Sequence, residues 1–178
     1  MSDAEAKNGG AGKEFDPFAG PALLIAAPST DSQREVWTAA RMGDDASCAF
    51  NESSSLHLRG RLDLEALRGA LTSVVERHEA LRTTFSPDGM TLYVSSSFEV
   101  AVPLVDLSGL TPSERDSHLE RILGEEVEKP FVLETGPLVR LCVVRLAEEE
   151  HSLVFTAHHI VCDGWSTGVI LRDMAALY

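Results

Sequence analysis

Residues 153–166 have the sequence LVFTAHHIVCDGWS, and the rest of the chain can be arranged around this stretch. Residues 153–161 form an apolar run rich in β-branched side chains, which is typical of a strand buried on both faces. A similar run at 138–146 precedes it, and the acidic turn 148–150 between them predicts a hairpin. After Asp163 and Gly164, apolar residues at helical spacing predict a final helix with one buried side.

Local signals outside this stretch predict alternating helices and strands. Thr30 and Thr111 each begin a capping box, Asp63 can cap a further helix, and residues 86–89 form a hairpin turn. Expected helices cover 30–42, the stretch after Asp63, and 111–128; expected strands cover 50–58, 81–85, 90–95 and 98–107. We therefore expect an α/β two-layer sandwich, with a mixed sheet and helices on one face, over residues 29–178. Residues 1–28, rich in Gly, Ala and Pro, are expected to be a flexible leader or linker.

Composition excludes several classes of protein. The 178 residues contain 15 Lys and Arg against 28 Asp and Glu, a net charge of -13, which argues against binding nucleic acid. The apolar stretch 22–27 is far shorter than the about 20 residues that span a bilayer, so no membrane anchor is expected. Three widely spaced cysteines without CxxC spacing predict neither disulfides nor a zinc site, and they favour a cytoplasmic protein.

The histidine pair His158-His159 carries the clearest chemical signal. Side chains alternate across a strand, so only one of the two can face a reactive site, and the other must be packed within the fold. An imidazole at a strand end can supply a base or a proton donor near neutral pH. Gly164 would allow close backbone approach, and amides at the start of the final helix could stabilise developing negative charge. The simpler alternative is a histidine satisfied within the core.

Other chemistries fit this cluster less well. Adjacent strand histidines diverge and have no third ligand at suitable spacing, so no metal site is expected. Ser166 is not part of a G-x-S-x-G elbow and is better explained as a helix cap.

Four motifs in order resemble those of the condensation domains of nonribosomal peptide synthetases, members of the chloramphenicol acetyltransferase-like superfamily. They are STDSQREVWTAARM at 29–42, RHEALRTTF at 77–85, PFVLETGPLVR at 130–140, and HHIVCDGWS at 158–166, which is similar to HHxxxDGWS.

The resemblance implies a two-lobed enzyme that encloses a tunnel. Donor and acceptor carrier proteins would deliver substrates on 4'-phosphopantetheine, and the acceptor amine would attack the donor thioester in nonribosomal peptide or hybrid polyketide-peptide synthesis. His159 would face the tunnel, as a general base or as an electrostatic stabiliser. Asp163 would be structural, paired with Arg82, and Trp165 and Ser166 would support the motif. The reaction implied needs no ATP, metal or directly bound cofactor.

The resemblance also implies that this chain is the amino-terminal lobe. The family is roughly twice as long, a size that exceeds one core, and motifs of its second lobe are absent from these 178 residues. The final helix ends at Tyr178 without a capping residue. We expect the missing carboxy-terminal lobe to be a partner, and catalysis by this lobe without it to be impaired.

Two alternatives remain open. An epimerisation domain of the same superfamily would use His159 to move an α-proton. A non-catalytic docking module would recruit a partner enzyme, although the intact motif at His158, His159, Asp163 and Gly164 speaks against this. A heterocyclisation domain is disfavoured because that branch replaces the paired His with Asp.

Overall fold

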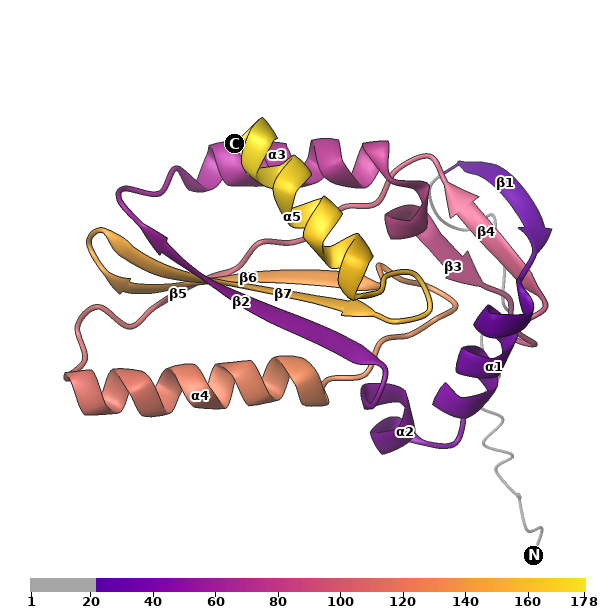
Figure 1. The fold of residues 1–178 in the computed structure, drawn as a ribbon, viewed down its shortest axis with the longest axis horizontal. Coiled ribbons are helices and arrows are strands. Elements are labelled where there is room, and N and C mark those ends of the chain that lie inside the picture. The colour runs from indigo at the N-terminus through magenta and orange to yellow at the C-terminus, as the bar shows by residue number, and fades with distance from the viewer. Residues whose placement is uncertain (1–21) are drawn as a thin grey trace, which may run out of the picture.

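The computed structural model describes residues 22–178, which form two sheets and their covering helices (Figure 1). The larger sheet has the strand order β2-β7-β6-β5, and its members are β2 (Asn51–Arg59), β5 (Leu104–Asp106), β6 (Val139–Ala147) and β7 (Glu150–His158). Strands β2, β7 and β6 are antiparallel, and β5 lies parallel to β6, so the expected mixed sheet is confirmed. The hairpin β6–β7 is also confirmed, and β7 is buried along nearly its whole length.

Helices cover both faces of this sheet, not one. Helices α3 (Leu64–Arg77) and α5 (Gly164–Leu177) lie on one side in Figure 1, and α4 (Pro112–Glu128) lies on the other. The alternation of side chains along β6 and β7 explains this arrangement. Leu141 and Phe155 belong to the core under α3 and α5, whereas Val144 and Val154 pack with Ile122 of α4. Since both faces of the central strands are apolar, each face requires its own helical layer.

The smaller sheet has the strand order β1-β4-β3 and corrects the expected extent of the leader. Strand β1 (Leu23–Pro28) pairs antiparallel with β4 (Thr91–Ser95), which pairs with β3 (Thr83–Phe85). The predicted β3–β4 hairpin is therefore confirmed, but residues 23–28 belong to the fold. Backbone hydrogen bonds to β4 order β1 even though several side chains of β1 are exposed. A local sequence pattern does not predict this pairing, because the partner strand is far away in the sequence. The rest of the expected leader, residues 1–21, lies outside the described residues.

Side chains satisfy the helix ends largely as the sequence predicts. The hydroxyl of Thr30 accepts from the amide of Gln33 at 3.2 Å, and the Gln33 side chain accepts from the amide of Thr30, which begins α1 (Asp31–Ala40). At α4, the Glu114 carboxylate accepts from the Thr111 amide at 3.0 Å. Asp63 caps α3 as expected. The short helix α2 (Asp44–Cys48) and the 3-10 helix η1 (Glu79–Arg82) complete the set of elements.

Three side chains from distant parts of the chain cap the carboxyl end of α4. Arg140 donates to the carbonyls of Glu126 and Lys129 at 2.7 and 2.8 Å and to the Glu126 carboxylate at 3.0 Å. Asn51 donates to the carbonyls of Val127 and Lys129, and the Cys48 thiol donates to the carbonyl of Glu128. These contacts replace the intrahelical bonds that a helix end lacks, and they fix α4 to β2 and β6.

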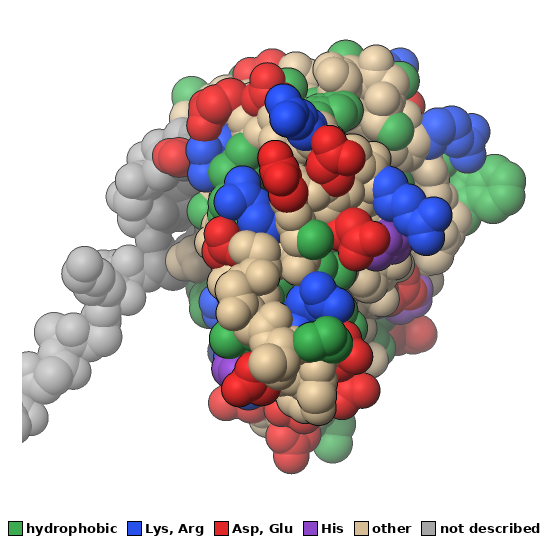
Figure 2. Space-filling model, turned by 90° about the vertical axis from the view of Figure 1, so that its left-hand side faces the viewer, with side chains coloured by type: hydrophobic (Ala, Val, Ile, Leu, Met, Phe, Trp, Pro, Cys, Tyr) green, Lys and Arg blue, Asp and Glu red, His purple; other side chains and the backbone are tan. Residues whose placement is uncertain are grey.

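Figure 2 shows the end of the molecule at which α4 begins, and there Lys and Arg side chains are interspersed with Asp and Glu. No helix in residues 22–178 combines the length and apolar character needed to cross a bilayer.

Candidate active site at the end of strand β7

The two histidines at the end of β7 lie in opposite environments, as strand alternation predicts. His158 is the last residue of β7 and is completely buried. His159 follows the strand, donates its amide to the carbonyl of Phe50 at 2.8 Å, and keeps 42% of its side chain exposed. The enzymatic interpretation needs an accessible imidazole, and only His159 meets that requirement.

His158 is held as a neutral ring. Its Nδ1 accepts a hydrogen bond from the amide of Ile160 at 3.2 Å, so the ring proton is assigned to Nε2, which has no partner among the described residues. The rings of Phe50 and Phe131 lie beside it, with centroids 5.9 and 6.1 Å away. Burial lowers the pKa of His158 to about 4, and the positive charges of His159 and Arg140 add to this. His158 therefore stays uncharged near neutral pH.

Two oxygen atoms lie beside the same ring nitrogen of His159. Its Nδ1 is hydrogen-bonded to the carbonyl of Cys162 at 3.1 Å and lies 2.8 Å from Oε1 of Glu52 in an ion-pair contact. The carbonyl of Cys162 can only accept, so the hydrogen-bond network assigns a proton to Nδ1. In the neutral ring the Nε2 lone pair is then free to accept a proton, which suits a general base.

Glu52 is the functional candidate that sequence reasoning missed. It lies on β2, where the register pairs it with Ala157 and pairs Asn51 with His158. No motif spacing connects Glu52 with His159, because only the pairing of β2 with β7 brings them together. The sole local signal is the predicted strand at 50–58, which does not reveal its neighbour in the sheet.

Asp163, expected to form an ion pair, instead caps helix α5. Its carboxylate accepts from the amide of Ser166 at 2.8 Å and from the Ser166 hydroxyl at 2.6 Å. The Ser166 hydroxyl, followed by the Ser166 amide, lowers the pKa of Asp163. The cap of α5 is therefore Asp163 and not Ser166, whose hydroxyl serves as a donor to it.

Arg82 does not contact Asp163, which corrects the expected pair. Its Nε and Nη2 donate to the carbonyls of Val75 and Glu76 at 3.0 Å each, and Nη1 donates to the carbonyl of Ser95. Within residues 22–178 no ion pair joins Arg82 to a carboxylate. All three nitrogens are used to tie the end of α3 to the end of β4, so Arg82 supports the fold away from the motif.

The two remaining motif residues are open to solvent. Trp165 is 82% exposed, so its side chain does not support the motif by packing within this chain. A Cβ placed on Gly164 would meet no atom within 4 Å. Space beside the start of α5 is thus free, which agrees with the expectation that another group can approach the backbone there.

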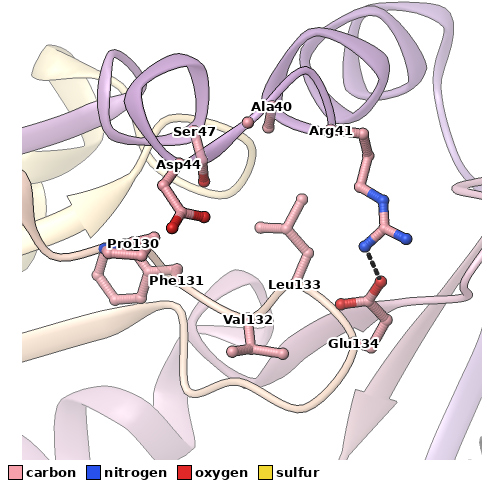
Figure 3. Close-up of a pocket in the computed structure, with 10 residues that line it drawn as sticks. Ala40, Arg41, Asp44, Ser47, Pro130, Phe131, Val132, Leu133 and Glu134 are labelled. Atoms are coloured by element: carbon pink, nitrogen blue, oxygen red, sulfur yellow. Dashed lines mark hydrogen bonds and ion pairs between the residues drawn. The ribbon is translucent and has the colours of Figure 1, made fainter. Parts of the chain in front are cut away.

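A cavity of about 330 Å³ lies near the histidine pair without including it (Figure 3). Helices α1 and α2 form one wall and residues 130–134 form the other, and an ion pair of 2.8 Å joins Arg41 to Glu134 at its side. Phe131 belongs to this wall and also packs edge-on against His158. Phe131 is therefore shared between the cavity wall and the packing around His158.

The possible metal ligands and the cysteines of residues 22–178 form neither a metal cluster nor a disulfide. No group of three His, Cys, Asp or Glu side chains in residues 22–178 is arranged to hold a metal ion. Cys48, Cys142 and Cys162 are free thiols, and burial is the main cause that raises the pKa of each.

A protein-family model described as Condensation domain matches residues 26–178. The chain belongs to the condensation domain family. A linear gramicidin synthase polypeptide of Brevibacillus parabrevis is 39% identical over 153 residues, which are 85% of this chain and 3% of that protein. Chondramide synthase cmdD of Chondromyces crocatus is 38% identical over 153 residues, 85% of this chain and 4% of that protein. The chain thus spans only a few per cent of the length of these two relatives.

Solved structures confirm the expected chloramphenicol acetyltransferase-like α/β fold. The starter condensation domain of the rhizomide synthetase RzmA superposes with a TM-score of 0.78 at 21% identity, covering 87% of this chain and 39% of that one. The X-domain, solved in a complex with OxyB from teicoplanin biosynthesis, superposes with a TM-score of 0.74 at 33% identity, covering 87% of this chain and 33% of that one. The two matches cover 39% and 33% of the solved chains.

Proposed function

We propose that this chain is the amino-terminal lobe of a condensation domain that joins a carrier-bound donor thioester to a carrier-bound acceptor amine. Membership of the condensation domain family supports the reaction class. Coverage of about a third of the solved chains supports the assignment to one lobe. The partners would be the donor and acceptor carrier proteins and the second lobe, and the substrates would arrive on 4'-phosphopantetheine arms.

His159 would act on the attacking amine. The amine nitrogen forms a bond to the thioester carbonyl carbon, and the π electrons of that carbonyl move to its oxygen. Nε2 of His159 accepts the proton that the nitrogen loses, or stabilises its positive charge by a hydrogen bond. The oxygen electrons then re-form the carbonyl, the C–S bond breaks, and the thiolate leaves with a proton, so that one amide and one thiol are produced.

One observation carries this proposal: His159 is accessible, with its Nδ1 bonded to the Cys162 carbonyl and beside the Glu52 carboxylate, whereas His158 is buried and neutral. The test is amide formation by the complete domain with both carrier proteins loaded. His159→Ala should lower kcat at least about 100-fold, the usual contribution of general acid–base catalysis. His57→Ala, which removes an exposed histidine of β2, is the matched control and should retain turnover. Undiminished turnover in His159→Ala would remove this residue from the mechanism.

A docking role is the second candidate, because of the 33% identity to the X-domain that was solved with OxyB. A docking module would bind a partner protein through this lobe and form no amide. Titration of the complete domain with OxyB and with loaded carrier proteins separates the two. Binding of OxyB together with a complete lack of amide formation would favour docking.

A further inference from the structure

Glu52 contacts the reactive histidine although the family motif does not include it. We propose that Glu52 is a positioning residue for amide formation, which holds the His159 ring with Nδ1 inward and Nε2 toward the substrate. This inference deepens the proposed function and rests on it. The proposal is based on the distance of 2.8 Å between Oε1 of Glu52 and Nδ1 of His159.

The backbone immediately before Glu52 is fixed. Asn51 donates its side-chain amide to the carbonyls of Val127 and Lys129 at 2.7 and 3.0 Å, which ties β2 to the end of α4. Just before β2 begins, the carbonyl of Phe50 accepts a hydrogen bond from the amide of His159 at 2.8 Å. The carboxylate and the imidazole therefore approach each other from two anchored backbones, so only side-chain rotamers remain to be fixed on contact.

The Glu52 carboxylate and the Cys162 carbonyl affect the His159 ring in different ways. The carbonyl of Cys162 lies 3.1 Å from Nδ1 and can orient the ring, but it carries no full charge. When Nε2 takes a proton, the ring becomes a cation, and the Glu52 carboxylate, 2.8 Å from Nδ1, then stabilises it by electrostatic attraction. The carboxylate of Asp163 also interacts with His159 through its charge, but its hydrogen bonds go to Ser166.

The solvent exposure of Glu52 and His159 determines how strongly a Glu52 substitution should lower kcat. The Glu52 side chain is 35% exposed and the His159 side chain 42%, so water screens the pair and the Cys162 carbonyl remains in every Glu52 variant. We expect Glu52→Gln and Glu52→Ala to lower kcat about 10-fold with KM for the carrier-bound substrates unchanged, because the contact affects the transition state more than substrate binding.

The kinetic experiment uses the complete domain with both carrier proteins loaded. Asp106→Asn is the matched control, since Asp106 is also a partly exposed carboxylate with a basic partner, Arg145, but lies on the edge strand β5. Asp106→Asn should keep wild-type kcat. If kcat of both Glu52 variants stays at the wild-type level, or if only KM changes, Glu52 does not position His159 for the reaction.

A spectroscopic readout on this chain separates a positioning role from a merely structural one. With 15N-labelled histidine, the ring nitrogen signals of His159 should place the proton on Nδ1 in the wild-type protein. Loss of the Glu52 charge beside Nδ1 should lower the share of the Nδ1-protonated tautomer in Glu52→Ala, although the Cys162 carbonyl remains, while backbone amide signals of the core are retained. An unchanged tautomer would overturn the proposal. If His159→Ala retained full turnover although Glu52→Ala altered the tautomer, the proposed function would fail and the link between Glu52 and His159 would stand.

Discussion

Two adjacent histidines of the same chemical type differ here because water reaches only one of them. His158 has no solvent contact, and its Nε2 has no hydrogen-bond partner among residues 22–178. A buried imidazole loses the hydration of its charged form, so it stays neutral. His159 is partly hydrated and faces a carboxylate. Placement relative to the sheet thus assigns a structural role to one ring and leaves the other for chemistry.

Stability should depend on pH through His158. Its folded-state pKa is about 4, below the ordinary value of 6.5, so protons bind preferentially to the unfolded chain. The stabilisation is present above pH 6.5 and is lost as the pH falls toward 4, a loss of roughly 3 kcal/mol in the free energy of unfolding. Urea unfolding at several pH values from 7 to 4 measures it. His158→Asn, which keeps an acceptor for the Ile160 amide, should show a shallower dependence than the wild-type protein.

The matched control for this prediction is His57→Asn, which changes an exposed histidine on β2 and should keep the wild-type dependence. Burial also lowers the pKa of His151, but that ring is present in every variant, so the difference between the curves reports on His158. Parallel curves for His158→Asn and the wild-type protein would contradict the prediction.

At the scale of elements, the β3–β4 hairpin depends on one glycine under an aromatic ring. Gly89 has a φ of +71°, and a Cβ added there would lie 2.7 Å from Cγ of Trp37 on α1. The carbonyl of Gly89 also accepts from the buried hydroxyl of Ser29 at 2.6 Å. The turn, the start of α1 and the smaller sheet are therefore packed as one unit.

Gly89→Ala should lower the free energy of unfolding by about 2 kcal/mol, because the left-handed backbone is strained for alanine and the Trp37 ring must move. Thermal unfolding followed by circular dichroism measures the change. Gly109→Ala is the control, since a Cβ there meets no atom within 4 Å and should have a much smaller effect. Equal stabilities for the two variants would show that the turn tolerates a side chain.

At the scale of the whole molecule, Arg140 connects the helical layer formed by α4 to the histidine pair. It caps α4, pairs with Glu126 at 3.0 Å, and lies 3.8 Å from the ring centre of Phe131, which packs against His158. The side chain is only 17% exposed, so these charge-assisted contacts are weakly screened. The position of α4 and the packing beneath the site are thus linked through one guanidinium.

Arg140→Lys should lower the free energy of unfolding by about 2 kcal/mol, since an ammonium cannot reproduce the fork of donors to Glu126 and Lys129 or stack on Phe131 in the same way. Chemical denaturation measures this. Arg121→Lys, at an exposed i,i+4 pair with Glu125, is the control and should change stability by less than about 0.5 kcal/mol. An equal change in the free energy of unfolding for both variants would mean that the Arg140 contacts stabilise the fold no more than an exposed ion pair does.

Predictions from the sequence were confirmed where the interactions that form an element join residues close together in the chain. The capping residues Thr30 and Asp63, the turn at 86–89 and the buried run of β7 each depend on neighbours within a few positions. The pairing of Arg82 with Asp163, taken from the family resemblance, was wrong for this chain because backbone carbonyls already occupy Arg82. The placement of helices on one face was also wrong, since alternating apolar residues on β6 and β7 require cover on both.

The order of residues along the chain was enough to predict most of the elements, the histidine motif and the family to which the chain is similar. Three-dimensional packing was needed to find Glu52 beside His159, Arg140 across the end of α4, and β1 on the smaller sheet. The physical reason is that periodicity and caps act over a few residues, whereas strand pairing and side-chain contacts between elements depend on which distant segments become neighbours.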